Sequence, residues 1–422
     1  MRSDYIDLGY KPNASDIIAE YFIEPAKGCT MQEVVNSVAG ESSIDTWTDI
    51  KTLKPATARR LKPHVFSIKK NVKIAYPLAL FEPGSIAQLL SSLAGNILSM
   101  KAVANLRLLD VHFPKSYVES FPGPKYGIPG IRTLLRIPSR PLLGTIVKPK
   151  MGLTPREHAK VAYEAWVGGV DLVKDDENLT NQTFNPFQER VKAVLSMRGR
   201  AEKETGSRKM YMANVTAATT EEMLSRAKYV KHLGGEYVMI DLITSGWTAV
   251  QSLRNANLGL VLHGHRCMHS ALTRNPKHGV SMMAIAKLAR LAGLDQLHTG
   301  TVIGKMEGSS SEVLNIDEEM EHQHIGQNDA AKVLAQDWYS IKPLLPVASG
   351  GLQPLMIPAL YKQFGNNIAL QFGGGIHAHP KGTRAGAKAA AQALEATLKG
   401  IPLKKYATGR HELADAIRKW GN

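Results

Sequence analysis

The chain has 422 residues, of which 44% are hydrophobic and 21% are charged, a balance typical of a globular protein with two domains or a barrel plus a further domain. Its net charge of +15 suits an anionic partner, either nucleic acid or a phosphorylated metabolite. The basic residues are scattered, without long runs or interleaved aromatic residues, so no nucleic-acid partner is expected.

The cysteine content and the chain start bear on location. Two cysteines, Cys29 and Cys267, are too few for a disulfide framework or a thiolate metal cage. The polar start MRSDYIDLGYKP lacks the apolar core of a signal peptide, and no apolar run approaches the roughly 20 residues that span a bilayer. A reducing, cytoplasmic location without a membrane partner is expected.

Residues 1–125 mix strand-like and helical segments and predict a smaller α+β domain of ferredoxin-like type. The strand-like segments are 19–25 and 70–81, and the helical ones are 30–40 and 85–106. The stretch FPGPKYGIPGIR, rich in Gly and Pro, is interpreted as the connection to a second domain that covers residues 126–422.

From residue 142 onward, a short apolar strand, a loop and a helical segment recur eight times. Near-continuous apolar strands suit a parallel sheet buried on both faces, and helical segments such as 154–169, 219–235 and 280–293 end near a glycine. This pattern predicts a (β/α)8 TIM barrel; a doubly wound sheet is the alternative, but no GxGxxG follows the first strand. The predicted strands are 142–150, 170–176, 210–216, 236–242, 258–265, 295–301, 344–350 and 368–374.

Polar residues gather at the C-terminal ends of these strands, whereas the N-terminal ends are apolar. In such a barrel the C-terminal ends form the rim of the active site. The residues concerned are Lys148 and Lys150 after the first strand, Lys174 to Glu177 after the second, His263 to Arg266 after the fifth, His298 in the sixth, Ser349 to Gly351 after the seventh and Gly373 to Gly375 after the eighth.

The second strand carries the most informative cluster, KDDE. Alternation places Lys174 and Asp176 on one face, with Glu177 able to turn in. Two carboxylates are too few to hold Mg²⁺ firmly, but a neutral lysine amine can react with CO₂ to form a carbamate, a further anionic oxygen ligand. Neighbouring acids raise the pKa of the amine, whereas a bound cation favours the carbamate. The alternative is a Lys–Asp–Glu ion-pair cluster.

Two other groups suit anion binding. The glycines at 350, 351, 373 and 374 lie where barrels commonly bind phosphate through backbone N–H groups, although they could be ordinary turns. Arg266 and His298 could hold a second phosphate, although the histidines could be structural. Zinc at His263 and His265 is less favoured, because the acids of the second strand offer a hard oxygen site.

Lys305 lies in a glycine-flanked loop, GTVIGKMEG, after the sixth strand. Such a loop can close over a substrate and bring its lysine onto developing negative charge. The alternative is a solvated loop lysine.

With these residues in view, the chain resembles the large chains of ribulose-1,5-bisphosphate carboxylase/oxygenase (RuBisCO), most closely the archaeal type. The matching segments run in family order from residue 41 to about 382. They are ESSIDTWTD, AGNILSMKAVANLRLLDVHFP, GTIVKPKMGL, GGVDLVKDDEN, HGHRCMH, LHTGTVIGKMEG, ASGGLQP and LQFGGGIHAHPKG.

The resemblance implies a role for each matching residue. Carbamylated Lys174 with Asp176 and Glu177 would ligate Mg²⁺, and the carbamate would remove the sugar proton. Lys148 would donate a proton late in the cycle, supported by Lys150. The others would act as follows: His265 shuttles protons, Lys305 steadies the incoming CO₂, Arg266 and His298 bind one phosphate, Ser349 contacts a substrate hydroxyl, and Gly350, Gly351, Gly373 and Gly374 surround the phosphates.

The resemblance also implies that the N-terminal domain completes the site of a neighbouring subunit, through Glu41, Thr46, Trp47 and Asn96. The chain is then expected to form a homodimer or an assembly of dimers, and no small subunit is expected. One departure stands out, because Ile44-Asp45 replaces the usual Thr-Gly before Thr-Trp. An extra acid beside a phosphate site should weaken anion binding.

Together these features predict a Mg²⁺-dependent carboxylase that converts ribulose 1,5-bisphosphate and CO₂ to 3-phosphoglycerate, with O₂ as substrate of a side reaction. A RuBisCO-like enolase or isomerase of another phosphorylated sugar is the nearest alternative, but Lys148, His298 and Lys305 are all present. A basic nucleic-acid-binding protein and a carbamate-bridged hydrolase are further alternatives; the hydrolase would need ligands for a second metal.

Overall fold

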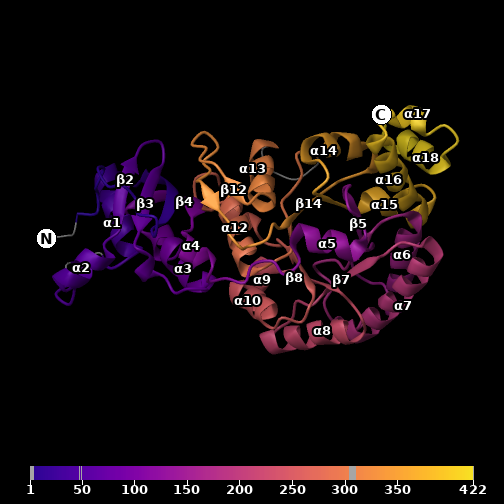
Figure 1. Cartoon of the computed structure of the whole chain (residues 1–422), viewed down its shortest axis with the longest axis horizontal. Helices are drawn as coiled ribbons and strands as arrows, with labels where there is room; N and C mark the ends of the chain where they lie inside the picture. Colours follow the sequence, from indigo (N-terminus) through magenta and orange to yellow (C-terminus); the bar gives the residue numbers. More distant parts are fainter. Residues whose placement is uncertain (1–3, 47, 49, 304–309, 422) are drawn as a thin grey trace. The chain divides into compact units, whose positions relative to one another are not determined.

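The computed structural model describes residues 4–46, 48, 50–303 and 310–421 (Figure 1). Contacts within the chain divide it into two compact units. The first comprises Met1–Gly123, Met268–Ala292 and His322–Ile341, and the second comprises Pro124–Cys267, Gly293–Glu321 and Lys342–Asn422. The expected boundary near residue 125 stays a prediction. No helix among the described residues is both long and apolar enough to cross a membrane.

The first unit has the ferredoxin-like order of elements. β1 (Ile17–Pro25), α1 (Met31–Glu41), β2 (His64–Ile68), β3 (Val72–Tyr76), α3 (Ile86–Leu93) and β4 (Val103–His112) follow one another, and the sheet order is β10-β4-β1-β3-β2. β10 (Gly279–Val280) pairs parallel with β4, whereas the other pairs are antiparallel. The remaining elements are α2 (Pro55–Leu61), η1 (Leu78–Leu80), η2 (Asn96–Ser99), α4 (Lys115–Val118), α11 (Ser270–Thr273), α12 (Met282–Ala292), β12 (His324–Ile325) and β13 (Gln336–Asp337).

The prediction of helical structure over 85–106 is confirmed for α3, which ends at Leu93, and for the short 3-10 helix η2 (Asn96–Ser99), but it is wrong from Val103, where β4 begins. After α3 the backbone of Gly95 turns close to the carbonyl oxygen of Ser91. A Cβ at Gly95 would lie 2.1 Å from that oxygen, so this turn requires a residue with no side chain. From Val103 the backbone pairs instead with β1, and Leu106 and Leu108 become buried. Pairing with a distant strand thus decides the conformation of this segment.

The second unit is a closed parallel barrel, which confirms the predicted TIM fold and excludes the doubly wound sheet. Its strand order is β11-β14-β15-β5-β6-β7-β8-β9, and every predicted strand is present. The strands are β5 (Leu142–Ile146), β6 (Leu172–Lys174), β7 (Met210–Asn214), β8 (Tyr237–Asp241), β9 (Val261–His265), β11 (Gln296–His298), β14 (Leu345–Ser349) and β15 (Ala369–Phe372).

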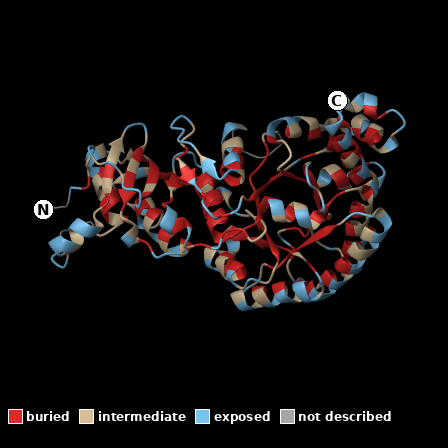
Figure 2. Cartoon of the chain, viewed as in Figure 1, coloured by how far each residue is buried: buried red, intermediate tan, exposed pale blue. Residues whose placement is uncertain are grey.

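Helices surround these strands; α6, α7 and α8 follow the outer edge of the ring (Figure 1). The strands are buried along nearly their whole length, whereas these helices expose their outer faces (Figure 2). The helices of this unit are α6 (Pro155–Gly168), α7 (Phe187–Thr205), α8 (Thr220–His232), α9 (Leu242–Ser245), α10 (Trp247–Asn255), α13 (Ser310–Glu321), η3 (Pro354–Met356), α14 (Ile357–Phe364), α15 (Gly374–His377), α16 (Gly382–Leu398), α17 (Leu403–Tyr406) and α18 (His411–Trp420).

The stretch interpreted as a connection holds the start of a further helix, α5 (Gly127–Leu135). Its residues Ile128, Ile131 and Leu135 are spaced to share one face and are buried in one core cluster with barrel residues. Those residues include the first positions of β5 and β6, Leu142 and Leu172. α5 therefore closes the N-terminal end of the barrel, and the opposite end remains for chemistry.

Candidate active site

Seven of the predicted residues form one continuous set of contacts at the C-terminal ends of the barrel strands. They come from the ends of β5, β6, β9, β11 and β14, which are far apart in sequence but close together around the barrel. The set comprises Lys148, Lys174, Glu177 and Asp176, then His265, His298 and Ser349.

Lys174 is the last residue of β6 and is fully buried. Its Nζ donates to the backbone oxygen of Asp175 at 2.7 Å and lies 3.6 Å from Oε2 of Glu177. Burial lowers the pKa of this amine, and the nearby carboxylates of Glu177 and Asp176 offset only part of that effect. The neighbouring acids alone would raise the pKa of Lys174. Burial has the larger effect and lowers this pKa, which favours the neutral amine.

Asp176 is also buried, and its Oδ2 accepts a hydrogen bond from Nζ of Lys148 at 2.6 Å. Burial would raise the pKa of this carboxyl, but the bonds from Lys148 and Asn178 outweigh it and lower the pKa. Lys148 is half-buried at the end of β5, and its side chain would lie 3.5 Å from a Cβ placed at Gly373. Asp176 and Lys148 thus join the ends of β5, β6 and β15.

The ion-pair interpretation holds for Asp175, the first acid of the cluster. Asp175 points to the opposite side of β6, where its Oδ2 accepts from Nε of Arg190 at 3.1 Å. Its Oδ1 accepts from the hydroxyl of Tyr211 at 2.7 Å and lies 3.1 Å from Nε2 of His158. Strand alternation therefore divides KDDE into a structural acid facing the helices and Lys174 with Asp176 facing the barrel end.

Glu177 links the second strand to the fifth. Its Oε2 lies 3.6 Å from Nε2 of His265, and Nδ1 of the same ring lies 3.2 Å from Oδ1 of Asp241 without the alignment of a hydrogen bond. Burial would raise the pKa of Glu177, but Lys174 and His265 outweigh it and lower the pKa. The side-chain amide of Asn214 donates to the backbone oxygen of Glu177 at 3.2 Å and steadies this turn.

His298 connects the fifth, sixth and seventh strands. Its Nδ1 lies 2.6 Å from the hydroxyl oxygen of Ser349, and its Nε2 lies 2.9 Å from Nε2 of His263. Its ring is also 4.7 Å from that of His265, centroid to centroid. Burial lowers the pKa of His298 well below its ordinary value, and the neighbouring histidines lower it further, so the ring is neutral at pH 7.

The two glycine turns approach each other closely. Gly350 and Gly351 have φ values of 115° and 76°, which favour glycine. A Cβ at Gly375 would lie 2.0 Å from the carbonyl oxygen of Leu352, so the two turns pack backbone against backbone. By contrast, a Cβ at Gly374 would have open space within 4 Å.

The remaining cations are less closely tied to this set. Burial lowers the pKa of Arg266 to about 10, while Glu312 and Asp317 raise it, so this guanidinium keeps its charge at pH 7. Lys150 is exposed. Lys305 lies outside the described residues, and its predicted role stays a prediction.

The donor set suits Mg²⁺. Within the described part of the chain, no group of three or more His, Cys, Asp and Glu side chains is placed to hold a metal. Asp176 and Glu177 provide two carboxylates beside the buried Nζ of Lys174, and a carbamate on that nitrogen would supply a third anionic oxygen donor. Such hard oxygen donors match this ion, so the residues present fit the expected cofactor.

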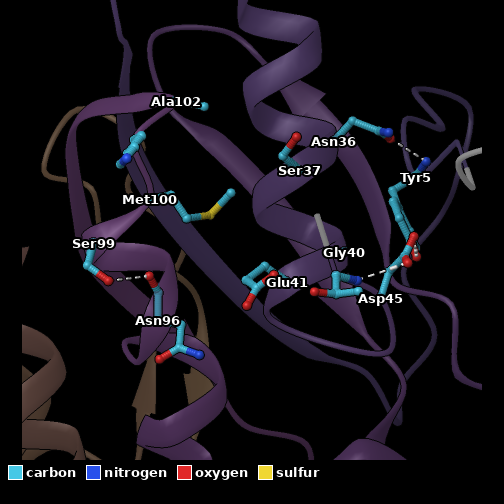
Figure 3. A pocket seen from close by; sticks show the side chains of 12 residues that line it. Tyr5, Asn36, Ser37, Gly40, Glu41, Asp45, Asn96, Ser99, Met100 and Ala102 are labelled. Carbon is cyan, nitrogen blue, oxygen red and sulfur yellow. Dashed lines mark hydrogen bonds between the residues drawn. The ribbon is translucent and has the colours of Figure 1, made fainter. Parts of the chain in front are cut away.

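The predicted residues of the first unit line a pocket of about 440 Å³ (Figure 3). Glu41, Thr46 and Asn96 border it, whereas Trp47 lies outside the described residues. Asp45 also borders it, but its carboxylate is engaged: Oδ2 accepts from the hydroxyl of Tyr5 at 3.1 Å and Oδ1 from the backbone N–H of Thr46 at 2.9 Å. The acid that was expected to repel anions therefore also shapes the backbone beside Thr46.

Several participants were missed in the sequence. Asn214 and Asp241 end β7 and β8. They would have been found if the polar residues at the C-terminal ends of the third and fourth predicted strands had also been considered. Gln296 begins β11 and contacts the site through His263. No sequence signal singles out Gln296, because its importance depends on a neighbouring strand.

Comparison with known proteins agrees with this geometry. Residues 127–420 match the family model of the ribulose bisphosphate carboxylase large chain, catalytic domain, and residues 4–117 match that of its N-terminal domain. The chain is 55% identical to the ribulose bisphosphate carboxylase of Methanosarcina mazei, with 100% of this chain and 99% of that protein covered.

Two solved structures are similarly close. The dimeric archaeal Rubisco from Hyperthermus butylicus superposes with a TM-score of 0.94 at 46% identity, over 99% of this chain and 98% of that chain. An octameric Rubisco from Pyrococcus horikoshii gives a TM-score of 0.92 at 44% identity, over 99% and 96%. The chain therefore belongs to the family of ribulose bisphosphate carboxylase large chains.

Proposed function

We propose that this chain catalyses the Mg²⁺-dependent carboxylation of ribulose 1,5-bisphosphate by CO₂ to give two molecules of 3-phosphoglycerate, with O₂ as substrate of a side reaction. One observation carries the proposal. A fully buried lysine amine lies 3.6 Å from a carboxylate, at the end of a barrel where a second lysine donates to a second carboxylate at 2.6 Å.

The residues of the second strand support the activation step. Because burial favours the neutral amine of Lys174, this nitrogen can attack CO₂ and lose a proton to become a carbamate. Carbamylated Lys174, Asp176 and Glu177 would then hold Mg²⁺. The ion, when bound, supplies charge that stabilises a developing enediolate. In this proposal the carbamylated side chain of Lys174 would remove the sugar proton, and Lys148, whose Nζ donates to Asp176 at 2.6 Å, would return a proton later.

The bisphosphate needs an anchor at each end. The turns at Gly350–Gly351 and Gly373–Gly374 support one phosphate through backbone N–H groups, and Arg266 with His298 supports the other. His265 is positioned for proton transfer, since it lies between Glu177 and Asp241. Lys150, Ser349 and the loop lysine Lys305 complete the proposed set.

We also propose that the chain works as a homodimer or an assembly of dimers without a small subunit. Glu41, Thr46 and Asn96 border a pocket of the first unit and would, with Trp47, complete the site of the partner. The relatives described as dimeric and octameric support this assembly.

Fixation of labelled CO₂ tests the proposal. The protein is activated with CO₂ and Mg²⁺ and then given labelled bicarbonate and ribulose bisphosphate; labelled 3-phosphoglycerate is expected, and chelation of Mg²⁺ should abolish it. Lys174→Met should fix no label. Lys209→Met is the matched control, because Lys209 is a second buried barrel lysine, whose Nζ bonds to the backbone oxygen of Val170 at 2.8 Å.

Absence of label with a folded wild-type dimer would contradict the carboxylase proposal. Exchange of the sugar proton with solvent without fixation would instead favour the RuBisCO-like enolase or isomerase.

A further inference from the structure

Four buried or half-buried polar side chains contact one another in series, from Gln296 through His263 and His298 to Ser349. His298 is part of the proposed phosphate site. Oε1 of Gln296 lies 3.0 Å from Nδ1 of His263, and Nε2 of His263 lies 2.9 Å from Nε2 of His298. Nδ1 of His298 then lies 2.6 Å from the hydroxyl of Ser349. Gln296 and His263 are both 0% exposed, so bulk solvent does not contact either side chain.

The contact between the rings of His263 and His298 limits how many N–H protons these four side chains carry. A nitrogen–nitrogen contact of 2.9 Å accommodates one proton, so one ring donates and the other accepts. Burial lowers the pKa of both His263 and His298 well below the ordinary value, so each neutral ring carries a single N–H. The tautomer of one histidine therefore determines the tautomer of the other.

Gln296 determines which arrangement is adopted. Its Oε1 can only accept, so Nδ1 of His263 carries the proton and Nε2 of His263 is an acceptor. His298 must then donate from Nε2, which leaves its Nδ1 as an acceptor for the hydroxyl proton of Ser349. Every contact between these four side chains is satisfied in this direction. Of their buried polar atoms in the described structure, only Nε2 of Gln296 lacks a hydrogen-bond partner.

We propose that Gln296 is a positioning residue that, through His263, sets the tautomer of His298, so that in the ligand-free protein Nδ1 of His298 bears no proton and Ser349 donates to it. The significance of this assignment rests on the proposed function. Ser349 then presents only lone pairs to a ligand and accepts a hydrogen bond from a sugar hydroxyl.

An anion bound at Nδ1 of His298 demands the opposite direction, because a phosphate oxygen needs a donor. If the amide of Gln296 turns by about half a revolution, its unpaired NH₂ group donates to Nδ1 of His263, and the N–H of each ring moves to the other nitrogen. All three contacts between the four side chains are kept in the reversed direction, and Oε1 of Gln296 takes the unpartnered place that Nε2 held before. A side chain that is both donor and acceptor is needed for this, and neither a hydrocarbon nor a carboxylate offers both.

Neutron diffraction from the full-length deuterated dimer tests the proposal, because it locates the deuterium on each nitrogen. In the ligand-free wild-type protein, deuterium is expected on Nδ1 of His263 and on Nε2 of His298. With inorganic phosphate bound beside His298, deuterium is expected on Nδ1 of His298 and Nε2 of His263. Gln296→Met should leave the rings without a preferred direction, with deuterium divided between the two nitrogens of each.

Gln371→Met is the matched control, since Gln371 is another barrel-strand glutamine, 1% exposed, with an unpartnered amide atom among the described residues. It should keep the wild-type tautomers. Deuterium on Nδ1 of His298 in the ligand-free wild-type protein, or unchanged tautomers in Gln296→Met, would overturn the proposal. If Gln296→Met does not fold, the two wild-type measurements still decide. These tautomers are read without turnover, so failure of the carboxylase assay would be a separate result.

Discussion

Replacement of the structural acid Asp175 by asparagine should destabilise the barrel strongly at neutral pH. The carboxylate is 0% exposed and accepts from Arg190, Tyr211 and the backbone N–H of Asn214 at 3.1, 2.7 and 3.0 Å. Asp175→Asn leaves the buried guanidinium of Arg190 without a counter-charge. Removal of one partner from a buried ion pair costs about 3–5 kcal/mol of the free energy of unfolding.

The effect should depend on pH with a defined sign. Burial would raise the pKa of Asp175, but Arg190 and His158 outweigh it and hold the pKa well below its ordinary value of about 4. The stabilisation is therefore complete above about pH 4, where both folded and unfolded chains are ionised, and is lost as the pH falls toward the lower folded-state pKa. At pH 3 the difference between wild type and variant should be about 1 kcal/mol smaller than at pH 7.

Urea unfolding followed by circular dichroism and by tryptophan fluorescence measures this difference, because Trp166 on α6 is buried within the same unit. Glu164→Gln is the matched control. It breaks a pair with Arg384 at 2.6 Å in which the arginine side chain is 48% exposed, and such pairs contribute less than about 1 kcal/mol. An Asp175→Asn cost of less than about 1 kcal/mol at pH 7, or a cost that grows in acid, would refute the reasoning.

Three further predictions concern acid stability, the glycine turns and the pocket of the first unit that Asp45 and Thr46 border. Burial lowers the pKa of His377 to about 4. Above the ordinary pKa of 6.5 this histidine is neutral in both the folded and the unfolded protein. As the pH falls from 6.5 toward 4, only the unfolded protein gains a proton at His377, so the free energy of unfolding decreases. Between pH 6.5 and 4.5 wild type should lose about 2 kcal/mol more stability than His377→Asn in urea titrations, and equal losses would contradict this. Gly375→Ala should lower the free energy of unfolding by about 1–3 kcal/mol because its Cβ would lie 2.0 Å from the oxygen of Leu352, whereas Gly374→Ala should fold like wild type; equal urea midpoints would refute the packing argument. Asp45→Asn removes a charge beside Thr46 while keeping a side-chain acceptor, and it should lower the KM for ribulose bisphosphate about threefold at low salt, with a smaller change at high salt. An unchanged KM at low salt would show that the charge of Asp45 does not affect the binding of ribulose bisphosphate.

The sequence by itself determined the architecture of the barrel and most of the polar side chains that meet at its C-terminal end. Buried parallel strands are continuous apolar runs, so each strand is visible locally, and the closing of a barrel then brings the C-terminal ends together without further information. Strand alternation likewise separates the faces of KDDE, because its period of two residues is a local property. For these reasons Lys148, Lys174, His265 and His298 could be placed in one site before any contact was known.

Only the tertiary structure decided the features that depend on partners distant in the sequence. The helix expected over 85–106 gives way to β4 because β1 offers a hydrogen-bonding partner, and α5 is a helix that packs into the open end of the barrel. Asp175 is structural because Arg190 reaches it from α7. The lowered pKa of Lys174 and the direction of the Gln296 chain depend on burial and on neighbouring strands, and neither is encoded in a local pattern.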